Sequence, residues 1–365
     1  MVQSIPAETA LAQPDLPHAL ETWIAMIDGA KKTIEVAQMY VSSRPGEGIE
    51  EVLQALRRAA DRGIRIRFLL SANMVDEEPE TLAAVRAIPA IEVAIINLKP
   101  LTGGIMHAKY WIVDEASAFV GSQNFDWRAL NQIHETGVLV RDANFSRKLL
   151  GIFESDWKLA RTGKIPPKGD TRGGDSGDVE LVASPAELNP AGVRAALPAL
   201  LELLAGAKES IQIQLLEYSP ASYSAGGDWL EIDDALRSAA ARGVKVQLLV
   251  SHWNTSKSSI GALKKLATIP NIAVKVAFVP EHSSGFIPYA RVIHTKQMVV
   301  DRSTYWVGTS NWSRGYFYAT RNVEVIMRRP ELARIGQRIF ETVWSQPYTE
   351  FVDPARNYPA PRKGS

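Results

Sequence analysis

Apolar side chains along this chain follow two alternating patterns, a helical spacing of three to four residues and short runs typical of buried strands. The first helical stretch has its apolar face at Leu20, Trp23, Ile24 and Ile27. Predicted strands follow at 33–40, 64–70 and 91–96, with a second amphipathic helix between the first two strands. This alternation indicates an α/β sandwich with a largely parallel sheet.

The same order of elements occurs a second time, which indicates an internal duplication. The second copy begins with apolar residues at matching spacings: Leu197, Leu200, Leu201 and Leu204. Its predicted strands lie at 210–218, 244–250 and 272–279. Each copy closes with a predicted helix, 143–161 in the first and 330–344 in the second. The chain is therefore predicted to fold as two tandem, pseudo-symmetric α-β-α sandwich halves.

Between the copies lies a segment rich in Pro, Gly and Asp and almost free of apolar side chains, residues 166–178. Such a composition is typical of an exposed linker. We therefore predict an N-terminal repeat over 1–165 and a C-terminal repeat over 179–365, separated by this linker.

The composition narrows the class of protein. Of the 365 residues, 46% are hydrophobic and 22% are charged, as in ordinary globular domains, and the formal net charge of +1 argues against a large basic face for duplex DNA. The absence of cysteine excludes disulfides, Cys-based zinc sites and a cysteine nucleophile. No apolar run reaches the ~18 residues of a membrane span. The first residues do not read as a signal peptide; removal of one before Val2, and with it a secreted or periplasmic location, stays open.

The chemically informative residues form a motif that occurs once in each half with identical spacing. The first copy consists of His107, Lys109, Asp114, Ser122 and Asn124. The second copy consists of His294, Lys296, Asp301, Thr309 and Asn311. Because two full copies at the same spacing lie inside a long internal repeat, we interpret the motif as functional rather than as a chance pairing of His and Lys.

Each His and Lys of the motif lies on a predicted strand, 107–113 or 294–300, where residues two apart share a face. His107 and Lys109 are therefore expected to project together into one pocket, and their counterparts to do the same. Asp114 is seven residues after His107 and so faces the other way. It is expected to anchor the turn that follows, like its counterpart in the second copy.

Two imidazoles, two ammonium groups and two amides in one pocket suit a phosphodiester substrate. The lysines and asparagines can bind non-bridging oxygens and stabilise the charge of the transition state. One imidazole can attack phosphorus while the other protonates the leaving oxygen, without a metal ion. Glu135 and Glu324, on predicted strands downstream, are expected to orient the imidazoles at Nδ1. The remaining histidines lack the spacing of metal ligands, and no cofactor is predicted.

The doubled pattern H-x-K-x4-D-x6-G-[ST]-x-N resembles that of the phospholipase D superfamily, over nearly the whole chain. The stretches 121–130, 248–253 and 287–313 are similar to those of the lysosomal phospholipase-D-like 5′-exonucleases of animals, a branch shared by poxvirus envelope phospholipase-like proteins. The resemblance implies a phosphohistidine intermediate, no metal, and one site at the junction of the halves. It implies His107 as nucleophile and His294 as general acid, with the reverse assignment open. It is also compatible with a homodimer.

Three functions remain open, in decreasing order of preference. The first is a 5′-exonuclease on single-stranded DNA or RNA, in which bases stack on aromatic residues near the motifs: Trp253, Tyr289, Trp312, Tyr316 and Phe317. The second is a phospholipase D or transphosphatidylase acting on phospholipids, with an apolar entrance near Phe286 and Ile287. The third is a catalytically silent scaffold, which is disfavoured because no motif residue is lost.

Overall fold

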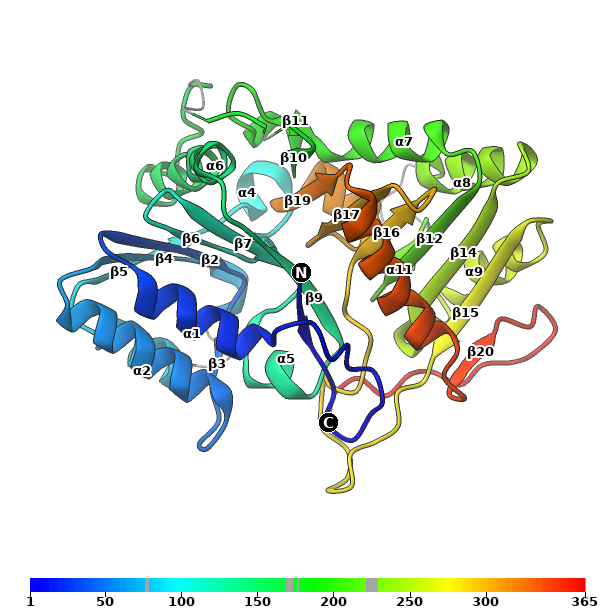
Figure 1. Cartoon of the computed structure of the whole chain (residues 1–365), viewed down its shortest axis with the longest axis horizontal. Coiled ribbons are helices and arrows are strands. Elements are labelled where there is room, and N and C mark those ends of the chain that lie inside the picture. Colours follow the sequence, from blue (N-terminus) through cyan, green and yellow to red (C-terminus); the bar gives the residue numbers. More distant parts are fainter. Residues whose placement is uncertain (76–78, 169–172, 176, 221–228, 365) are drawn as a thin grey trace.

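The computed structural model describes residues 1–75, 79–168, 173–175, 177–220 and 229–364, and two α/β halves lie side by side in it (Figure 1). The predicted fold class of two tandem sandwich halves is confirmed. Of the predicted linker, residues 169–172 and 176 lie outside the described part. A boundary between the repeats at 166–178 therefore stays our prediction.

The N-terminal half is built on a mixed sheet with the strand order β1-β9-β7-β6-β2-β4-β5. Its strands are β1 Val2–Ser4, β2 Thr33–Gln38, β4 Arg65–Ser71, β5 Ile91–Ile96, β6 Tyr110–Val113, β7 Ser117–Gly121 and β9 Glu135–Val140. Its helices are α1 Ala19–Gly29, α2 Gly48–Asp61, α3 Pro79–Arg86, α4 Lys99–Thr102, α5 Trp127–Asn131 and α6 Ala143–Thr162, with a 3₁₀ turn η1 Ala72–Met74. Apolar residues of α1, α2 and α3 pack on one face of the sheet, and those of α6 pack on the other.

The C-terminal half repeats this plan with the strand order β11-β10-β19-β17-β16-β12-β14-β15-β20. Its strands are β10 Val179–Ser184, β11 Arg194–Ala195, β12 Ser210–Leu215, β14 Lys245–Ser251, β15 Ile272–Ala277, β16 Gln297–Val300, β17 Thr304–Gly308, β19 Asn322–Met327 and β20 Thr349–Phe351. Its helices are α7 Ala196–Gly206, α8 Glu231–Ala241, α9 Ile260–Ala267, α10 Arg314–Tyr318 and α11 Pro330–Trp344, with 3₁₀ turns η2 Ala186–Leu188 and η3 His252–Thr255. Two short parallel pairs stand apart from the main sheets: β3 Val41–Ser42 with β8 Phe125–Asp126, and β13 Tyr218–Ser219 with β18 Trp312–Ser313.

The sheets are mixed, so the prediction of a largely parallel sheet was wrong. In each half three strands run parallel, β2-β4-β5 and β12-β14-β15, whereas the strands that carry the second part of the motif pair antiparallel. Asp114 and Glu115 both take a φ of 54°, and the Ala116 amide donates to Val113 O at 3.0 Å. Two successive left-handed residues form a tight hairpin turn, which joins β6 directly to β7 as an antiparallel neighbour. A parallel neighbour would have required a crossover helix.

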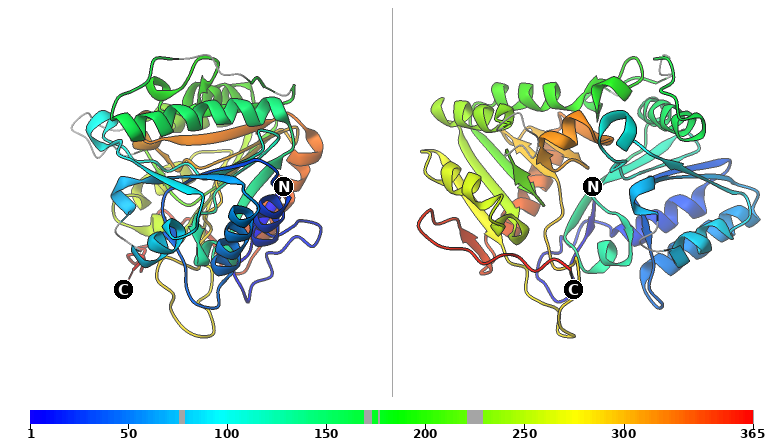
Figure 2. Two further views of the ribbon diagram at one scale, coloured as in Figure 1. Left: turned by 90° about the vertical axis from the view of Figure 1, so that its left-hand side faces the viewer. Right: turned by 180° about the vertical axis from the view of Figure 1, so that it is seen from behind.

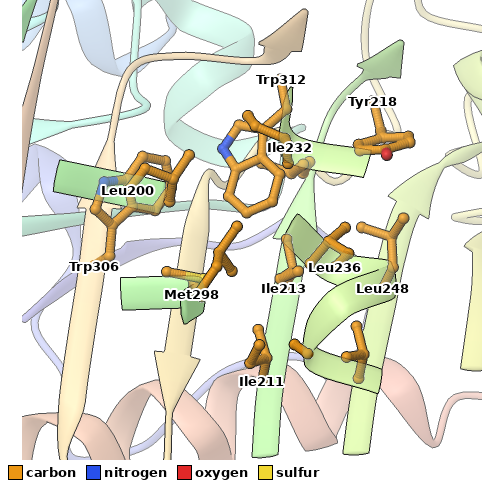
Figure 3. Packing of buried hydrophobic residues seen from close by; sticks show 14 of the residues in the cluster. Leu200, Ile211, Ile213, Tyr218, Ile232, Leu236, Leu248, Met298, Trp306 and Trp312 are labelled. Atoms are coloured by element: carbon orange, nitrogen blue, oxygen red, sulfur yellow. The ribbon is translucent and has the colours of Figure 1, made fainter. Parts of the chain in front are cut away.

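Each half has its own apolar core, and a third core joins them. Figure 3 shows the C-terminal core, in which the indoles of Trp306 and Trp312 pack edge to face with ring centroids 5.9 Å apart. The N-terminal core also contains an aromatic pair, Trp23 and Trp111, with ring centroids 5.2 Å apart. The joining core combines residues of α6 and β6 with residues of β17 and β19. The halves therefore share buried surface as well as a junction.

Backbone hydrogen bonds cross the junction at two pseudo-equivalent places. The amide of His107 donates to Arg321 O and that of Arg321 donates to Ile105 O, both at 2.9 Å. At the pseudo-equivalent place, the amide of His294 donates to His134 O at 2.9 Å, and that of His134 donates to Val292 O at 3.0 Å. Each half thus supplies the backbone that fixes the motif histidine of the other.

Both chain ends return to the junction. The N-terminal strand β1 pairs with β9, and Arg291 of the C-terminal half donates through Nη1 to Ala7 O at 2.7 Å. Seen from behind, the C-terminal tail runs from β20 back across the molecule (Figure 2). The helices of the described ranges include none that is long and apolar enough to span a bilayer.

Arg321 provides a first test of the junction. Its guanidinium is fully buried, and its Nη2 donates to Asp156 Oδ1 of α6 at 2.9 Å. Removing one partner of a buried ion pair leaves an uncompensated charge, so we expect Asp156→Ala to lower the free energy of unfolding by about 3–5 kcal/mol. Urea unfolding measures the change.

The exposed pair of Asp28 and Arg58, 2.9 Å apart, is the matched control. Asp28→Ala should cost less than about 1 kcal/mol, because solvent screens exposed ion pairs. Equal losses for the two variants would contradict a structural role of the buried pair.

Candidate active site

The motif histidines lie at the junction, and both side chains are almost completely buried. Each precedes a strand rather than belonging to it, since β6 begins at Tyr110 and β16 at Gln297. The predicted strands 107–113 and 294–300 were therefore too long. The physical reason is that the backbone before each strand bonds across the junction to the opposite half.

The two imidazoles and the two ammonium groups are brought into one site. Burial, followed by the nearby charges of Lys109 and Lys296, holds the pKa of His107 well below its usual value of 6.5. Burial and the same two lysines lower the pKa of His294 in the same way. Both histidines lie at the junction, where the His107 amide donates to Arg321 O and the His294 amide donates to His134 O.

Both lysines of the motif are buried, and they differ in their hydrogen bonding. Lys109 Nζ donates to His107 O at 2.6 Å, whereas Lys296 Nζ is buried and contacts no hydrogen-bond acceptor among the described residues. Burial lowers the pKa of Lys109 well below 10.5 and that of Lys296 to about 7. An anion bound between the two ammonium groups would restore their affinity for protons. The electrostatics therefore favour a phosphate-like ligand.

The amide side chains of the motif are buried as well. Asn311 Nδ2 donates to the hydroxyl of Tyr316 at 3.0 Å, and the ring of Tyr316 stands edge-on to the His107 imidazole with centroids 5.0 Å apart. Asn124 is also buried, within the same junction. Tyr316 is thus a neighbour of both a histidine and an amide of the motif.

Glu135 orients the second histidine. Its two carboxylate oxygens lie 2.9 and 2.8 Å from His294 Nδ1, across the junction. Burial raises the pKa of Glu135 to about 7 and, with the two lysines, lowers that of His294. The predicted carboxylate–imidazole contact is present, and it joins the N-terminal half to the histidine of the C-terminal half.

The first histidine has a different partner. His107 Nδ1 lies 3.0 Å from Asn322 Oδ1, so Asn322 occupies the place that Glu324 was expected to take. The Asn322 amide nitrogen donates to Tyr316 O at 3.0 Å and to Thr320 O at 3.2 Å, which fixes its orientation. Its oxygen can only accept, and therefore His107 carries its proton on Nδ1 and presents a free lone pair on Nε2.

Asn322 was missed although the sequence contains its signal. Glu135 lies fourteen residues after Gly121, and Asn322 lies fourteen residues after Gly308. In the sheets Gly121 pairs with Gly137 and Gly308 pairs with Glu324, so Glu324 corresponds to Gly137. Glu324 lies two residues after the true counterpart of Glu135, and its carboxylate suggested a false equivalence of the two glutamates.

Glu324 instead lies beneath the motif glycine of its own half. Its buried carboxylate accepts a short hydrogen bond from the Ser310 hydroxyl, and burial raises its pKa to about 7. A Cβ on Gly308 would lie 2.3 Å from Glu324 Cγ, so a glycine is required there. Glu324 shapes the loop that carries Asn311 and does not contact either histidine ring by a described hydrogen bond.

The aspartates of the motif tie the hairpin turn to the start of the central strand. Asp114 accepts hydrogen bonds of 2.7–2.9 Å from three successive amides, those of Lys31, Lys32 and Thr33. Asp301 accepts from the corresponding amides of Lys208, Glu209 and Ser210 at 2.8–2.9 Å. The motif aspartates thus support the fold at a distance from the histidines.

The motif hydroxyls hold the strands that carry the orienting side chains. Ser122 Oγ donates to Thr136 O at 3.2 Å, next to Glu135. Thr309 Oγ1 donates to Asn322 Oδ1 at 2.9 Å. The first motif has Ser122 where the second has Thr309, and both residues supply the hydroxyl that makes these hydrogen bonds.

Two of the aromatic residues predicted to bind substrate do not face the site. Trp312 is fully buried and Phe317 nearly so, and both belong to the C-terminal core (Figure 3 labels Trp312). Their apolar faces are used in packing, which corrects the prediction. Trp253 is half-buried and Tyr289 is 57% exposed, so both remain accessible. In the described ranges no three His, Cys, Asp or Glu side chains gather in a way that would hold a metal ion.

Known proteins are similar to this chain in sequence and in fold. The family described as cardiolipin synthase, PLD-like domain, matches residues 23–157 and 200–344. The chain is 32% identical over 395 residues to the 5'-3' exonuclease PLD3 of Macaca fascicularis, with 97% of this chain and 80% of that protein covered. It is 31% identical over 384 residues to phospholipase D Z of Dictyostelium discoideum, covering 96% and 89%. The solved phosphatidylserine synthase of Haemophilus influenzae Rd KW20 has the same fold, with a TM-score of 0.64 at 12% identity over 91% of this chain and 85% of that one.

The buried carboxyl of Glu324 makes stability depend on pH. Its pKa is raised from 4.5 to about 7 in the folded protein, so between these values the unfolded chain releases a proton that the folded protein keeps. Stability is therefore lost as the pH rises through this window. We expect Glu324→Gln to raise the free energy of unfolding near pH 8 by up to about 3 kcal/mol, with little change near pH 4.

Urea unfolding of the variant and the wild type at both pH values measures the effect. Glu331→Gln, at an exposed position of α11, is the matched control and should behave like the wild type at both. A stabilisation of Glu324→Gln that is equal at the two pH values would exclude ionisation as its cause.

Proposed function

Because the chain belongs to the phospholipase D superfamily and is a phosphodiesterase of that family, we propose that it removes nucleotides from the 5′ end of single-stranded DNA or RNA through a covalent phosphohistidine. The observation that supports this most is that both motif histidines are buried at the junction, each held at Nδ1 by a side chain of the other half. No metal ion takes part in the proposed reaction, since Lys109 and Lys296 supply the positive charge.

The two histidines differ in a way that assigns their roles. His107 is held by an amide oxygen as a neutral ring with a free lone pair on Nε2, which is the form needed to attack phosphorus. His294 Nδ1 lies 2.8 Å from the Glu135 carboxylate, and the negative phosphate of a bound substrate together with this carboxylate would offset burial and favour the imidazolium. We therefore assign His107 as nucleophile and His294 as general acid.

The reaction then takes two steps. His107 Nε2 forms a bond to phosphorus, the bond from phosphorus to O5′ of the following nucleotide breaks, and the proton of His294 passes to that oxygen. A water molecule next gives a proton to His294 as it attacks phosphorus, and the phosphorus–nitrogen bond breaks. The product is a nucleotide with a 3′-phosphate, and both histidines return to their starting forms.

The lysines and asparagines of the motif would hold the non-bridging oxygens throughout. Charge grows on these oxygens in the five-coordinate transition state, so donors placed in a dry site stabilise it more than the substrate. Lys296 is the best placed, because its buried ammonium has no acceptor among the described side chains. Asn124 and Asn311 supply uncharged donors from the two halves.

A nucleic acid substrate is supported by the relative named as a 5'-3' exonuclease, which aligns with nearly the whole chain. A single strand fits the nearly complete burial of both histidines better than a stiff duplex does, because one flexible strand can enter a narrow site. The net charge of +1 also favours a local positive site over a broad basic face.

A phospholipid substrate is the second candidate, because one relative is named phospholipase D Z. The chemistry would be the same, with the headgroup oxygen as leaving group. Phe286 and Ile287 are half-buried and lie near the exposed Tyr289 in sequence, which gives only a small apolar entrance. We therefore place the nuclease first.

Labelled oligonucleotides test the substrate and the polarity. In excess EDTA, single-stranded DNA labelled at the 5′ end should release a labelled mononucleotide at once, whereas the same strand labelled at the 3′ end should shorten through a ladder. His107→Ala should abolish both reactions. Cleavage of phosphatidylcholine in mixed micelles, with both DNA substrates untouched, would show that the lipid is the substrate.

A chromogenic ester tests the roles of the two histidines. In thymidine 3′-(p-nitrophenyl phosphate) the leaving group needs no proton, so the general acid is not required for the first step. We expect His294→Ala to release about one nitrophenolate per protein in a burst and then stop, and His107→Ala to show no burst. Rapid mixing with absorbance detection measures it. A burst from His107→Ala alone would reverse the assignment.

A further inference from the structure

A carboxylate, two aromatic rings and a lysine from the C-terminal tail meet beside the active site. The carboxylate is that of Glu217, which directly precedes β13. The amide of Trp312 donates to Glu217 O at 3.1 Å, so Glu217 lies across this short strand pair from Asn311. Its charge also acts on the buried ammonium of Lys296. Glu217 therefore borders the phosphate-binding part of the site.

The aromatic rings are those of Trp253 and Tyr289. They stand edge to face with centroids 6.4 Å apart. Trp253 packs against a small apolar cluster that contains Leu216 and Ile133, the neighbours of Glu217 and His134 in the chain. Tyr289 is 57% exposed and takes a φ of 60°, a conformation rare for a bulky residue. The pair is thus fixed at the rim of the site with one ring accessible.

The lysine is Lys363, near the end of the tail that returns to the junction (Figure 1). Its ammonium lies 3.0 Å from Glu217 Oε1 and 4.8 Å from the centroid of the Trp253 ring. Its carbonyl accepts from the Tyr289 amide at 2.7 Å. One residue of the tail thus covers a flat aromatic face and neutralises the adjacent acid.

The pseudo-equivalent place in the N-terminal half is built differently. Tyr40 follows β2 as Glu217 follows β12, and its hydroxyl donates to Asp126 Oδ2 at 2.6 Å. Asp126 is in turn paired with Arg128 at 3.1 Å. The acid at this place is therefore paired within its own half, whereas Glu217 is paired with Lys363 of the distant C-terminal tail.

We propose that Glu217, Trp253 and Tyr289 form the subsite for the nucleoside on the 3′-oxygen side of the scissile phosphate, and that Lys363 covers it until substrate enters. This inference rests on the proposed nuclease function and adds the place where the terminal nucleoside binds. When substrate enters, its base stacks on the Trp253 ring in place of the Lys363 ammonium. Glu217 then accepts hydrogen bonds from sugar hydroxyls or base N–H groups.

The side of the site agrees with the assigned roles. The nucleoside that stays on the phosphohistidine is the one attached through O3′. Asn311, across the short strand pair from Glu217, donates to the hydroxyl of Tyr316 at 3.0 Å, and the Tyr316 ring stands edge-on to His107. Glu217 is therefore linked through two residues to the nucleophile that holds this nucleoside.

Two small esters test the subsite without a DNA strand. Thymidine 3′-(p-nitrophenyl phosphate) carries the nucleoside, and methyl p-nitrophenyl phosphate lacks it, so the ratio of their kcat/KM values measures recognition of the nucleoside. We expect Trp253→Ala to lower this ratio roughly tenfold, as loss of one stacking interaction does. Trp253→Phe keeps a flat ring and should retain most of the ratio.

Phe351→Ala is the matched control, because Phe351 is exposed on β20 and takes no part in the site. Its ratio should equal that of the wild type. Equal losses of Trp253→Ala on both esters would assign Trp253 to the fold and overturn the subsite, as would a wild-type ratio near one.

Lys363 is tested with the same pair of esters. Lys363→Met should raise the ratio about threefold or more, because the nucleoside no longer has to displace the lysine. The rise should be modest, because an exposed cation–π contact and a solvated ion pair are both weak interactions. Lys363→Arg keeps the cover and should stay near the wild type. A lower ratio in Lys363→Met would make Lys363 a substrate contact and overturn its covering role. If both esters are cleaved with the expected ratios and DNA is not, the nuclease function fails while the nucleoside subsite stands.

Discussion

The exchange of backbone hydrogen bonds across the junction is the constraint on which the active site depends. His107 is fixed by the carbonyl of Arg321, and His294 is fixed by the carbonyl of His134. The residue next to each carbonyl, Asn322 or Glu135, then reaches the Nδ1 atom of the same imidazole. Backbone and side chain from one half therefore set the position and the tautomer of the histidine from the other, and the joining core keeps the halves in register.

The same exchange of hydrogen bonds explains how two equivalent histidines can have different chemical roles. The fold gives each histidine one neighbour on Nδ1, and the chemistry needs one ring that attacks and one that donates a proton. An amide at one place and a carboxylate at the other separate these tasks while the backbone stays nearly symmetric. Burial lowers the pKa of Lys109 and Lys296, because a buried cation is unfavourable until it is paired. A bound anion would supply the missing partner and so favour the charged form of both lysines.

Much of this could be predicted from the sequence, because the repeated spacing makes each copy a check on the other. The two halves and the meeting of His107 and His294 at the junction follow from that repeat, whereas Asn322, the counterpart of Glu135, was missed because it is not a carboxylate. The strand directions did not, since apolar periodicity carries no sign of chain reversal and the hairpin depends on left-handed backbone at Asp114. The role of Trp312 was also missed, because a residue beside the motif can point into the core as readily as into the site.

The fusion of the two copies in one chain has a consequence for how such a site diverges. In a pair of identical chains related by a twofold axis, every substitution appears twice, so the partner of both histidines must be the same residue. A single chain with two copies escapes that symmetry. Asn322 facing His107, Glu135 facing His294 and the tail lysine beside Glu217 are differences that a pair of identical chains could not keep.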